Sequence, residues 1–217
     1  MLFGICFAIV WLFCRPLFPT KVIGKKKLPK EGGYVLVCNH YSNMDCIILD
    51  LCLVKKLRFL AKKELFKNKF VSYFLKKFGG YPINRDKPDI SAFKFSIDVL
   101  RKKKVLAIFP EGTRNKNEEA MKDLKFGAVT FASRGNAQIV PVVLYRKPKI
   151  FRRNYILIGD PIDLVGENPS KLTKEEVEMN AQNLYDTMQQ IRADFEQKKN
   201  KKKARNKNGE KESKWSK

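Results

Sequence analysis

Two short polar segments carry the residues whose types and spacing suit chemistry. The first spans residues 39–45 (NHYSNMD) and contains His40, the single histidine among 217 residues. An imidazole can take up a proton near neutral pH and so act as a general base. Asp45 can accept a hydrogen bond from one ring nitrogen, which fixes the tautomer and leaves the other nitrogen free. The spacing therefore suggests a His40–Asp45 pair.

Flanking elements must bring these two side chains together. Residues 34–38 (YVLVC) predict a buried strand, and residues 44–54 predict a mostly apolar helix. On one helix, positions five apart do not face each other, but across a strand-to-helix turn they can. A strand end of this kind is also where sites on such sheets form.

Other interpretations of this segment stay open at this point. His40 can be structural, with Asp45 and Ser42 capping the helix. Ser42, activated by His40, is a candidate nucleophile, and so is Cys38, which shares a strand face with His40.

The second segment is FPEGTR, residues 109–114, directly after a predicted buried strand at 105–109. Pro110 and Gly112 predict a tight turn. Glu111 can bind hydroxyl groups, and Arg114 can bind phosphate oxygens in a bidentate way. An exposed turn held by salt bridges is the alternative.

The remaining elements predict one α/β domain with a mixed, largely buried sheet flanked by helices. Strands are expected at 57–60, 81–84, 138–144 and 154–158, and helices at 63–78, 90–103, 125–134 and 173–197. Phenylalanines recur at helical spacing from Phe66 to Phe78, which predicts a stripe facing the core or, alternatively, a lipid-facing helix. We expect a membrane-associated segment at 1–19, a catalytic domain at 20–197 and a disordered basic tail at 198–217.

Charge and cysteine content limit the possible partners. The net charge of +23 favours polyanions, and ten of the 45 Lys and Arg residues lie in the tail at 198–217. A basic nucleic-acid-binding protein is therefore the competing class, although no nucleic-acid-binding motif is present. The five cysteines are odd in number and form no C-x-x-C pair, so neither a disulfide framework nor a zinc site is expected. The apolar run at 1–14 is short for a membrane span, so it is a short anchor, a segment lying in the membrane interface or a buried core helix. If it inserts, the lysines after it keep the catalytic domain on the cytoplasmic side.

The two segments together resemble the 1-acylglycerol-3-phosphate O-acyltransferase family of glycerolipid acyltransferases, whose motifs are NHxxxxD and FPEGTR. Two weaker blocks agree with this resemblance: residues 80–85 (GYPINR) and residues 139–143 (IVPVV). All four blocks occur in the family's order and cover roughly residues 30–145.

The resemblance implies a role for each matched residue. His40 matches the general base and Asp45 its orienting partner. Arg85 matches a residue that helps to bind the acceptor's phosphate. The block containing Glu111, Gly112, Thr113 and Arg114 matches the one that positions the glycerol phosphate. Lys125 shortly follows this block, where it is either additional positive charge at the site or a surface lysine.

The resemblance also implies the reaction and its partners. A fatty acyl group would pass from an acyl carrier protein or coenzyme A thioester to lysophosphatidic acid, giving phosphatidic acid without a metal or bound cofactor. Glycerol 3-phosphate or another lysolipid is the alternative acceptor. The expected location is the cell membrane, with the domain on the cytoplasmic face and in contact with anionic lipids.

Overall fold

The computed structural model describes residue 12 and residues 16–53, 56–84, 88–115 and 124–215. Most of the expected membrane segment at 1–19 lies outside these residues, and so does Arg85. In the described part of the chain, no helix is both long and apolar enough to span a bilayer.

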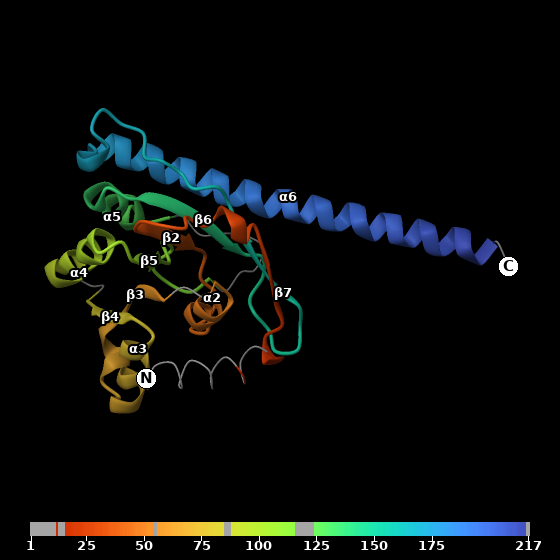
Figure 1. Ribbon diagram of the computed structural model, residues 1–217, viewed down its shortest axis with the longest axis horizontal. Coiled ribbons are helices and arrows are strands. Elements are labelled where there is room, and N and C mark those ends of the chain that lie inside the picture. Colours follow the sequence, from red (N-terminus) through yellow and green to blue (C-terminus); the bar gives the residue numbers. More distant parts are fainter. Residues whose placement is uncertain (1–11, 13–15, 54–55, 85–87, 116–123, 216–217) are drawn as a thin grey trace.

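A seven-stranded mixed sheet forms the centre of the domain (Figure 1). Its five strands from β6 to β4 are parallel, whereas β7 and β1 run in the opposite direction. The predicted mixed sheet is therefore confirmed. In spatial order the strands are β1 (Thr20–Ile23), β7 (Asn154–Ile158), β6 (Gln138–Leu144), β2 (Tyr34–Cys38), β5 (Val105–Ile108), β3 (Leu57–Lys62) and β4 (Gly80–Ile83).

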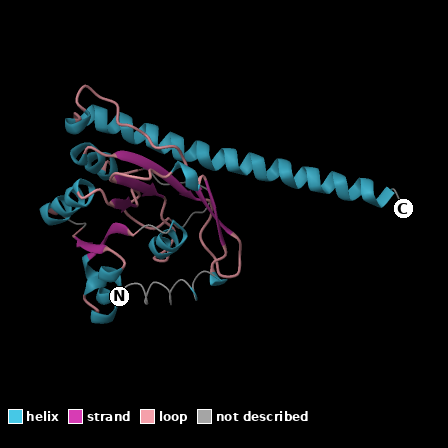
Figure 2. Cartoon of the chain, in the orientation of Figure 1, coloured by secondary structure: helices cyan, strands magenta, loops and turns pink. Residues whose placement is uncertain are grey.

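Helices cover both faces of the sheet (Figure 2). One face packs against α2 (Asp45–Leu53) and the partly buried side of α3 (Lys69–Lys77). The other packs against α4 (Ile90–Arg101), α5 (Gly127–Gly135) and the first half of α6 (Lys174–Trp215). Short 3-10 turns lie at Lys25–Lys27, Lys63–Phe66 and Pro169–Lys171.

Strand β2 is apolar throughout because it is buried on both faces of the sheet. Leu36 and Cys38 face the core beneath α2, whereas Val35 and Val37 face the core beneath α4 and α5. All five residues of β2 are buried, because helices cover both faces of the sheet at this strand. The strand is thus a rigid support for the turn that begins at its carboxyl end.

Two local elements differ from the sequence expectation. Strand β1 was not predicted; it is a short edge strand that pairs with β7, and its residues alternate in burial. The predicted helix at 63–78 is a 3-10 turn followed by α3, because the Asn68 side chain accepts hydrogen bonds from the N–H groups of Phe70 and Val71 and caps the helix there. Phe66 and Phe74 pack against the core, whereas Phe70 is 72% exposed.

Helix α6 is longer than the sequence suggests. It continues to Trp215, so residues 198–215 of the tail are helical where we expected disorder. Its first half is anchored on the sheet by Leu184 and Met188, and its second half extends well beyond the domain (Figure 1). Lysine, arginine, glutamate and alanine are good helix formers, and extending an anchored helix requires no new nucleus.

Candidate active site

The turn between β2 and α2 brings His40 and Asp45 into contact. The His40 Nδ1 atom lies 2.9 Å from Asp45 Oδ2. Asp45 is completely buried, and the His40 side chain is 12% exposed. Asp45 is the first residue of α2, where the helix dipole favours a carboxylate. The turn therefore produces the pairing that the spacing suggested.

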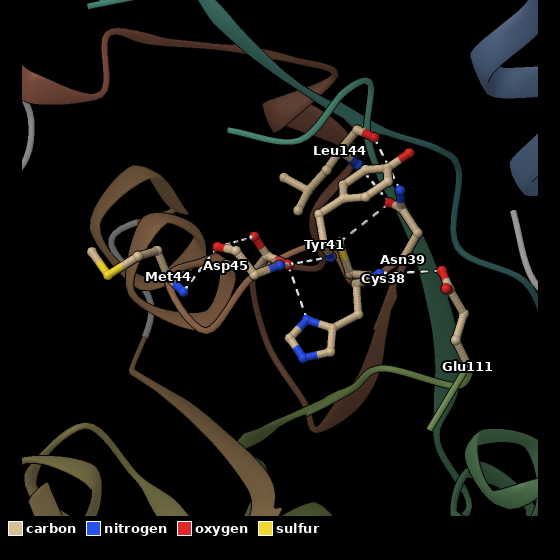
Figure 3. Close-up of polar contacts among 9 residues, drawn as sticks. Cys38, Asn39, Tyr41, Met44, Asp45, Glu111 and Leu144 are labelled. Atoms are coloured by element: carbon tan, nitrogen blue, oxygen red, sulfur yellow. Dashed lines mark hydrogen bonds and ion pairs between the residues drawn. The ribbon is translucent and has the colours of Figure 1, made fainter. Parts of the chain in front are cut away.

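Further hydrogen bonds to Asp45 indicate which ring nitrogen of His40 carries the proton. Its Oδ2 atom also accepts hydrogen bonds from the Tyr41 and Ser42 backbone N–H groups at 2.7 and 2.8 Å, and Oδ1 accepts one from Ser42 Oγ at 3.2 Å (Figure 3). An ionised carboxylate only accepts hydrogen bonds. The proton of the neutral imidazole therefore belongs on Nδ1, which leaves the lone pair on Nε2. Such a nitrogen can act as a general base.

The FPEGTR block and the residue after it, Asn115, contact His40 through both its ring and its backbone. The Phe109 ring lies under the imidazole, with ring centroids 4.3 Å apart. The His40 backbone N–H donates to Glu111 Oε1 at 3.2 Å, and the His40 carbonyl accepts from the Asn115 N–H at 2.6 Å. Both motifs follow carboxyl ends of adjacent parallel strands, β2 and β5. The second motif thus fixes the backbone of the candidate base.

Glu111 lies against the backbone of His40. It is only 4% exposed, and one of its carboxylate oxygens is committed to the His40 backbone. The structure therefore gives Glu111 a positioning contact. Its expected contact with the substrate stays a prediction.

The other residues of the block are brought to the same edge of the sheet. Gly112 adopts a φ of +67°, which favours glycine, and the Lys125 side chain crosses directly over it. Thr113 and Arg114 are exposed beside this turn. Lys125 is therefore adjacent to the block in space as well as in sequence. Arg85 lies outside the described residues.

Neither alternative nucleophile is arranged for attack. The Ser42 hydroxyl contacts the Asp45 carboxylate and accepts from the Met44 N–H at 3.1 Å, so it serves as a helix cap. Cys38 is fully buried, and burial raises the pKa of its thiol well above the usual value. The capping interpretation of Ser42 and Asp45 and the pairing of Asp45 with His40 hold simultaneously.

Asn39 is a supporting residue that sequence reasoning missed. Its buried amide accepts from the Leu144 N–H at 2.8 Å and donates to the Leu144 carbonyl at 3.0 Å (Figure 3). The amide therefore ties the end of β2 to the end of β6. Its position inside the NHxxxxD segment was the available signal, but the partner 105 residues away was not visible in the sequence.

Tyr41 links the same turn to the long C-terminal helix. Its hydroxyl lies 3.5 Å from a guanidinium nitrogen of Arg192 on α6. Burial raises the pKa of Tyr41, with the nearby Arg192 charge acting in the opposite direction. Among the described residues, no cluster of three or more His, Cys, Asp or Glu side chains is arranged to hold a metal ion.

Comparison with known sequences identifies the class to which this fold and site correspond. The model of the acyltransferase family matches residues 19–145, which include both motifs. The chain is 36% identical over 150 residues to a 1-acyl-sn-glycerol-3-phosphate acyltransferase of Bacillus subtilis (strain 168), covering 66% of this chain and 73% of that relative. The chain therefore belongs to the acyltransferase family, and it is an enzyme of that class.

Further comparisons agree on the family and the fold. A Streptococcus pneumoniae (strain ATCC BAA-255 / R6) protein of the same name is 31% identical over 174 residues, and the match spans 76% of this chain and 63% of that relative. The crystal structure of the 1-acyl-sn-glycerophosphate acyltransferase PlsC of Thermotoga maritima superposes with a TM-score of 0.61 at 23% identity. The superposition covers 79% of this chain and 70% of the Thermotoga maritima chain, and it shows that the two proteins share a fold.

Proposed function

We propose that this enzyme transfers a fatty acyl group from an acyl thioester to the free hydroxyl of 1-acylglycerol 3-phosphate, giving phosphatidic acid. The observation that supports it most is the partly buried His40–Asp45 pair, whose histidine backbone is held by the FPEGTR block at the carboxyl edge of the sheet. Relatives from Bacillus subtilis and Streptococcus pneumoniae carry the name of this activity.

In the proposed step, His40 Nε2 removes the proton from the acceptor hydroxyl. The hydroxyl oxygen then attacks the thioester carbonyl carbon, the new C–O bond forms and the C–S bond breaks. The leaving thiolate recovers a proton, for which the imidazolium is the nearest donor. Asp45 holds Nδ1–H throughout and stabilises the transient positive charge on the ring.

No acyl-enzyme forms in this mechanism. Cys38 is buried and its thiol pKa is raised, and the Ser42 hydroxyl is occupied as a cap. The reactive thioester arrives with the donor, so we propose that the step requires neither a metal nor a bound cofactor. The acyl donor is an acyl carrier protein or coenzyme A thioester.

The acceptor's phosphate requires positive charge near the base. Arg114 is one residue from Asn115, whose backbone N–H contacts the His40 carbonyl, and its side chain is exposed. We assign Arg114 and Thr113 to the acceptor phosphate and glycerol, with Gly112 allowing close approach of the backbone. Arg85 remains a proposed phosphate ligand on the grounds of its motif alone.

The acceptor and product are both membrane lipids, so the enzyme is proposed to work at an anionic bilayer surface on the cytoplasmic side. Its net charge of +23 attracts anionic lipid headgroups. The apolar segment at 1–19 supplies a proposed hydrophobic contact.

Acceptor selectivity tests the proposal. The wild-type chain would be offered a labelled acyl thioester on either carrier, together with lysophosphatidic acid, glycerol 3-phosphate or lysophosphatidylcholine. The proposal expects phosphatidic acid from the first acceptor at the highest kcat/KM. A preference for glycerol 3-phosphate, or no product from any acceptor, would overturn the assignment of substrate.

A further inference from the structure

The connection between β6 and β7 has an unusual surface. Five of its eight residues from 146 to 153 are Lys or Arg, and none is acidic. At its tip, Ile150 is 54% exposed and Phe151 is 80% exposed. Apolar tips flanked by cations suit a boundary between lipid headgroups and acyl chains.

This connection is braced, so the exposure of Phe151 is built into its structure. The Asn154 amide bonds both the N–H and the carbonyl of Lys149, at 3.1 and 3.2 Å. The Arg152 guanidinium donates to the Lys147 carbonyl. Phe151 has a φ of +56°, a costly conformation for a bulky residue, and its N–H donates to the Leu17 carbonyl at 2.8 Å. The tip is therefore presented outward in a fixed shape.

A basic pocket lies at the base of the connection. It has a volume of about 200 Å³, and its lining includes Arg146, Arg152, Arg153 and Lys199 around the rings of Tyr145 and Tyr155. The Lys199 ammonium lies 4.7 Å from the Tyr145 ring centroid. Among the described residues, no acidic side chain lines it, although Glu196 contacts the nearby Tyr145 hydroxyl at 3.2 Å. Such a set of cations suits phosphate oxygens.

The connection between β6 and β7 lies on the same side of the domain as His40. It follows the carboxyl end of β6, which is parallel to β2, so it lies at the edge of the sheet that carries His40. Its backbone bonds to Leu17 and, through Asn154, to Pro19, directly after the apolar N-terminal run. Figure 1 shows this connection and α3, with its exposed Phe70, on the same lower side of the domain.

We propose that residues 146–153 form a membrane-docking loop. Ile150 and Phe151 enter the interfacial layer of an anionic bilayer, and Arg146, Arg152, Arg153 and Lys199 hold lipid phosphates. Docking in this way turns the His40 edge of the sheet toward the lipid surface. This contact is independent of the acyl-transfer chemistry and is measured without it.

A tryptophan at the tip reports on the contact directly, even if another segment dominates overall membrane affinity. In a full-length chain with Trp11 and Trp215 replaced by Phe, we expect Phe151→Trp emission to shift to the blue and to be quenched by brominated lipid in phosphatidylcholine–phosphatidylglycerol vesicles. Val165→Trp in the same background, at an exposed site outside this loop, is the control and should not respond. A Phe151→Trp signal unchanged by vesicles would overturn the proposal.

Charge reversal tests the pocket. Arg152→Glu/Arg153→Glu should weaken binding to anionic vesicles about tenfold or more, and the Phe151→Trp shift should fall with it. Arg101→Glu/Arg134→Glu, with the same change in net charge on exposed helix ends, should have a clearly smaller effect. Equal effects from both pairs would contradict a specific site. The proposal would also be contradicted if Arg152→Glu/Arg153→Glu weakened binding of a soluble coenzyme A thioester and left vesicle binding intact. The pocket would then bind the phosphates of the acyl donor.

Discussion

The backbone N–H of His40 donates a hydrogen bond to the carboxylate of Glu111 at 3.2 Å, which joins two motifs 71 residues apart in the sequence. Glu111 is buried, and the next turn returns through Asn115 to the His40 carbonyl. The candidate base is therefore held through its main chain by one motif and through its ring by Asp45.

This relationship predicts different effects for two substitutions of Glu111. Glu111→Gln keeps an oxygen that can accept the His40 N–H, so its kcat should stay within about tenfold of wild type. Glu111→Ala leaves that N–H without its acceptor, and kcat should fall by about 10–100-fold with the acceptor KM little changed. Steady-state kinetics separates the two parameters. A raised acceptor KM in both variants would instead indicate direct contact with the substrate.

Asp45→Asn tests the orientation of the imidazole. The amide no longer stabilises the proton on Nδ1 or the imidazolium, so kcat should fall by about 10²–10⁴-fold with the acceptor KM nearly constant. Ser42→Ala is the matched control, because it removes the helix cap while the His40–Asp45 contact stays; it should cost about 1 kcal/mol of stability and less than tenfold in kcat. If the two variants lose activity equally, Asp45 has only a capping role.

Arg114→Ala tests recognition of the acceptor's phosphate. Loss of a guanidinium–phosphate contact should raise the acceptor KM by about 10–100-fold and leave the thioester KM unchanged. Arg134→Ala, at an exposed position in the last turn of α5, controls for the loss of one positive charge. An unchanged acceptor KM and rate for Arg114→Ala would remove this residue from the site.

The buried Asp50 should make the protein less stable as the pH rises, so replacing it with asparagine should stabilise the protein at neutral pH. Burial raises its pKa from 3.8 to about 6, and its Oδ2 atom has no hydrogen-bond partner among the described residues. The folded protein therefore holds a proton that the unfolded chain releases, and this group's contribution to stability falls as the pH rises from 4 through 6. Asp50→Asn should be about 1–3 kcal/mol more stable than wild type at pH 7.5.

Denaturant unfolding at several pH values checks this prediction. The difference between Asp50→Asn and wild type should shrink as the pH falls through 6 toward 4, where the wild-type carboxyl is itself protonated. Asp98→Asn, at an exposed position paired with Lys102, should change stability far less. A variant that is less stable than wild type at every pH would show that the Asp50 charge is stabilising.

The central strands were predictable because their burial is encoded locally. Strands β2, β6 and β7 have the predicted bounds, since each is a short run of apolar residues between polar turns. The edge strand β1 was missed because its four residues gain their structure from pairing with β7, over 130 positions later. The length of α6 was also underestimated. The polar composition after residue 198 suggested disorder, yet the helix continues there because its first half is anchored on the sheet.

In the candidate site, contacts within one segment were predictable from the sequence, whereas contacts between separate strands were not. The strand-to-helix turn indicated the contact between His40 and Asp45, because the relevant geometry spans only five residues. The contacts that support His40 from Glu111 and Asn115, and the link from Asn39 to Leu144, join separate strands and depend on the strand order. Spacing within one segment carries no information about that order.

The most direct test of the account is acyl transfer to lysophosphatidic acid by wild type and His40→Ala, with acyl carrier protein and coenzyme A thioesters both offered. Unfolding curves for the two proteins establish that the variant is folded. The account predicts phosphatidic acid from wild type and a loss of at least about 10³-fold in kcat for folded His40→Ala. A folded His40→Ala chain with near wild-type activity would show that His40 is structural and would contradict the mechanism.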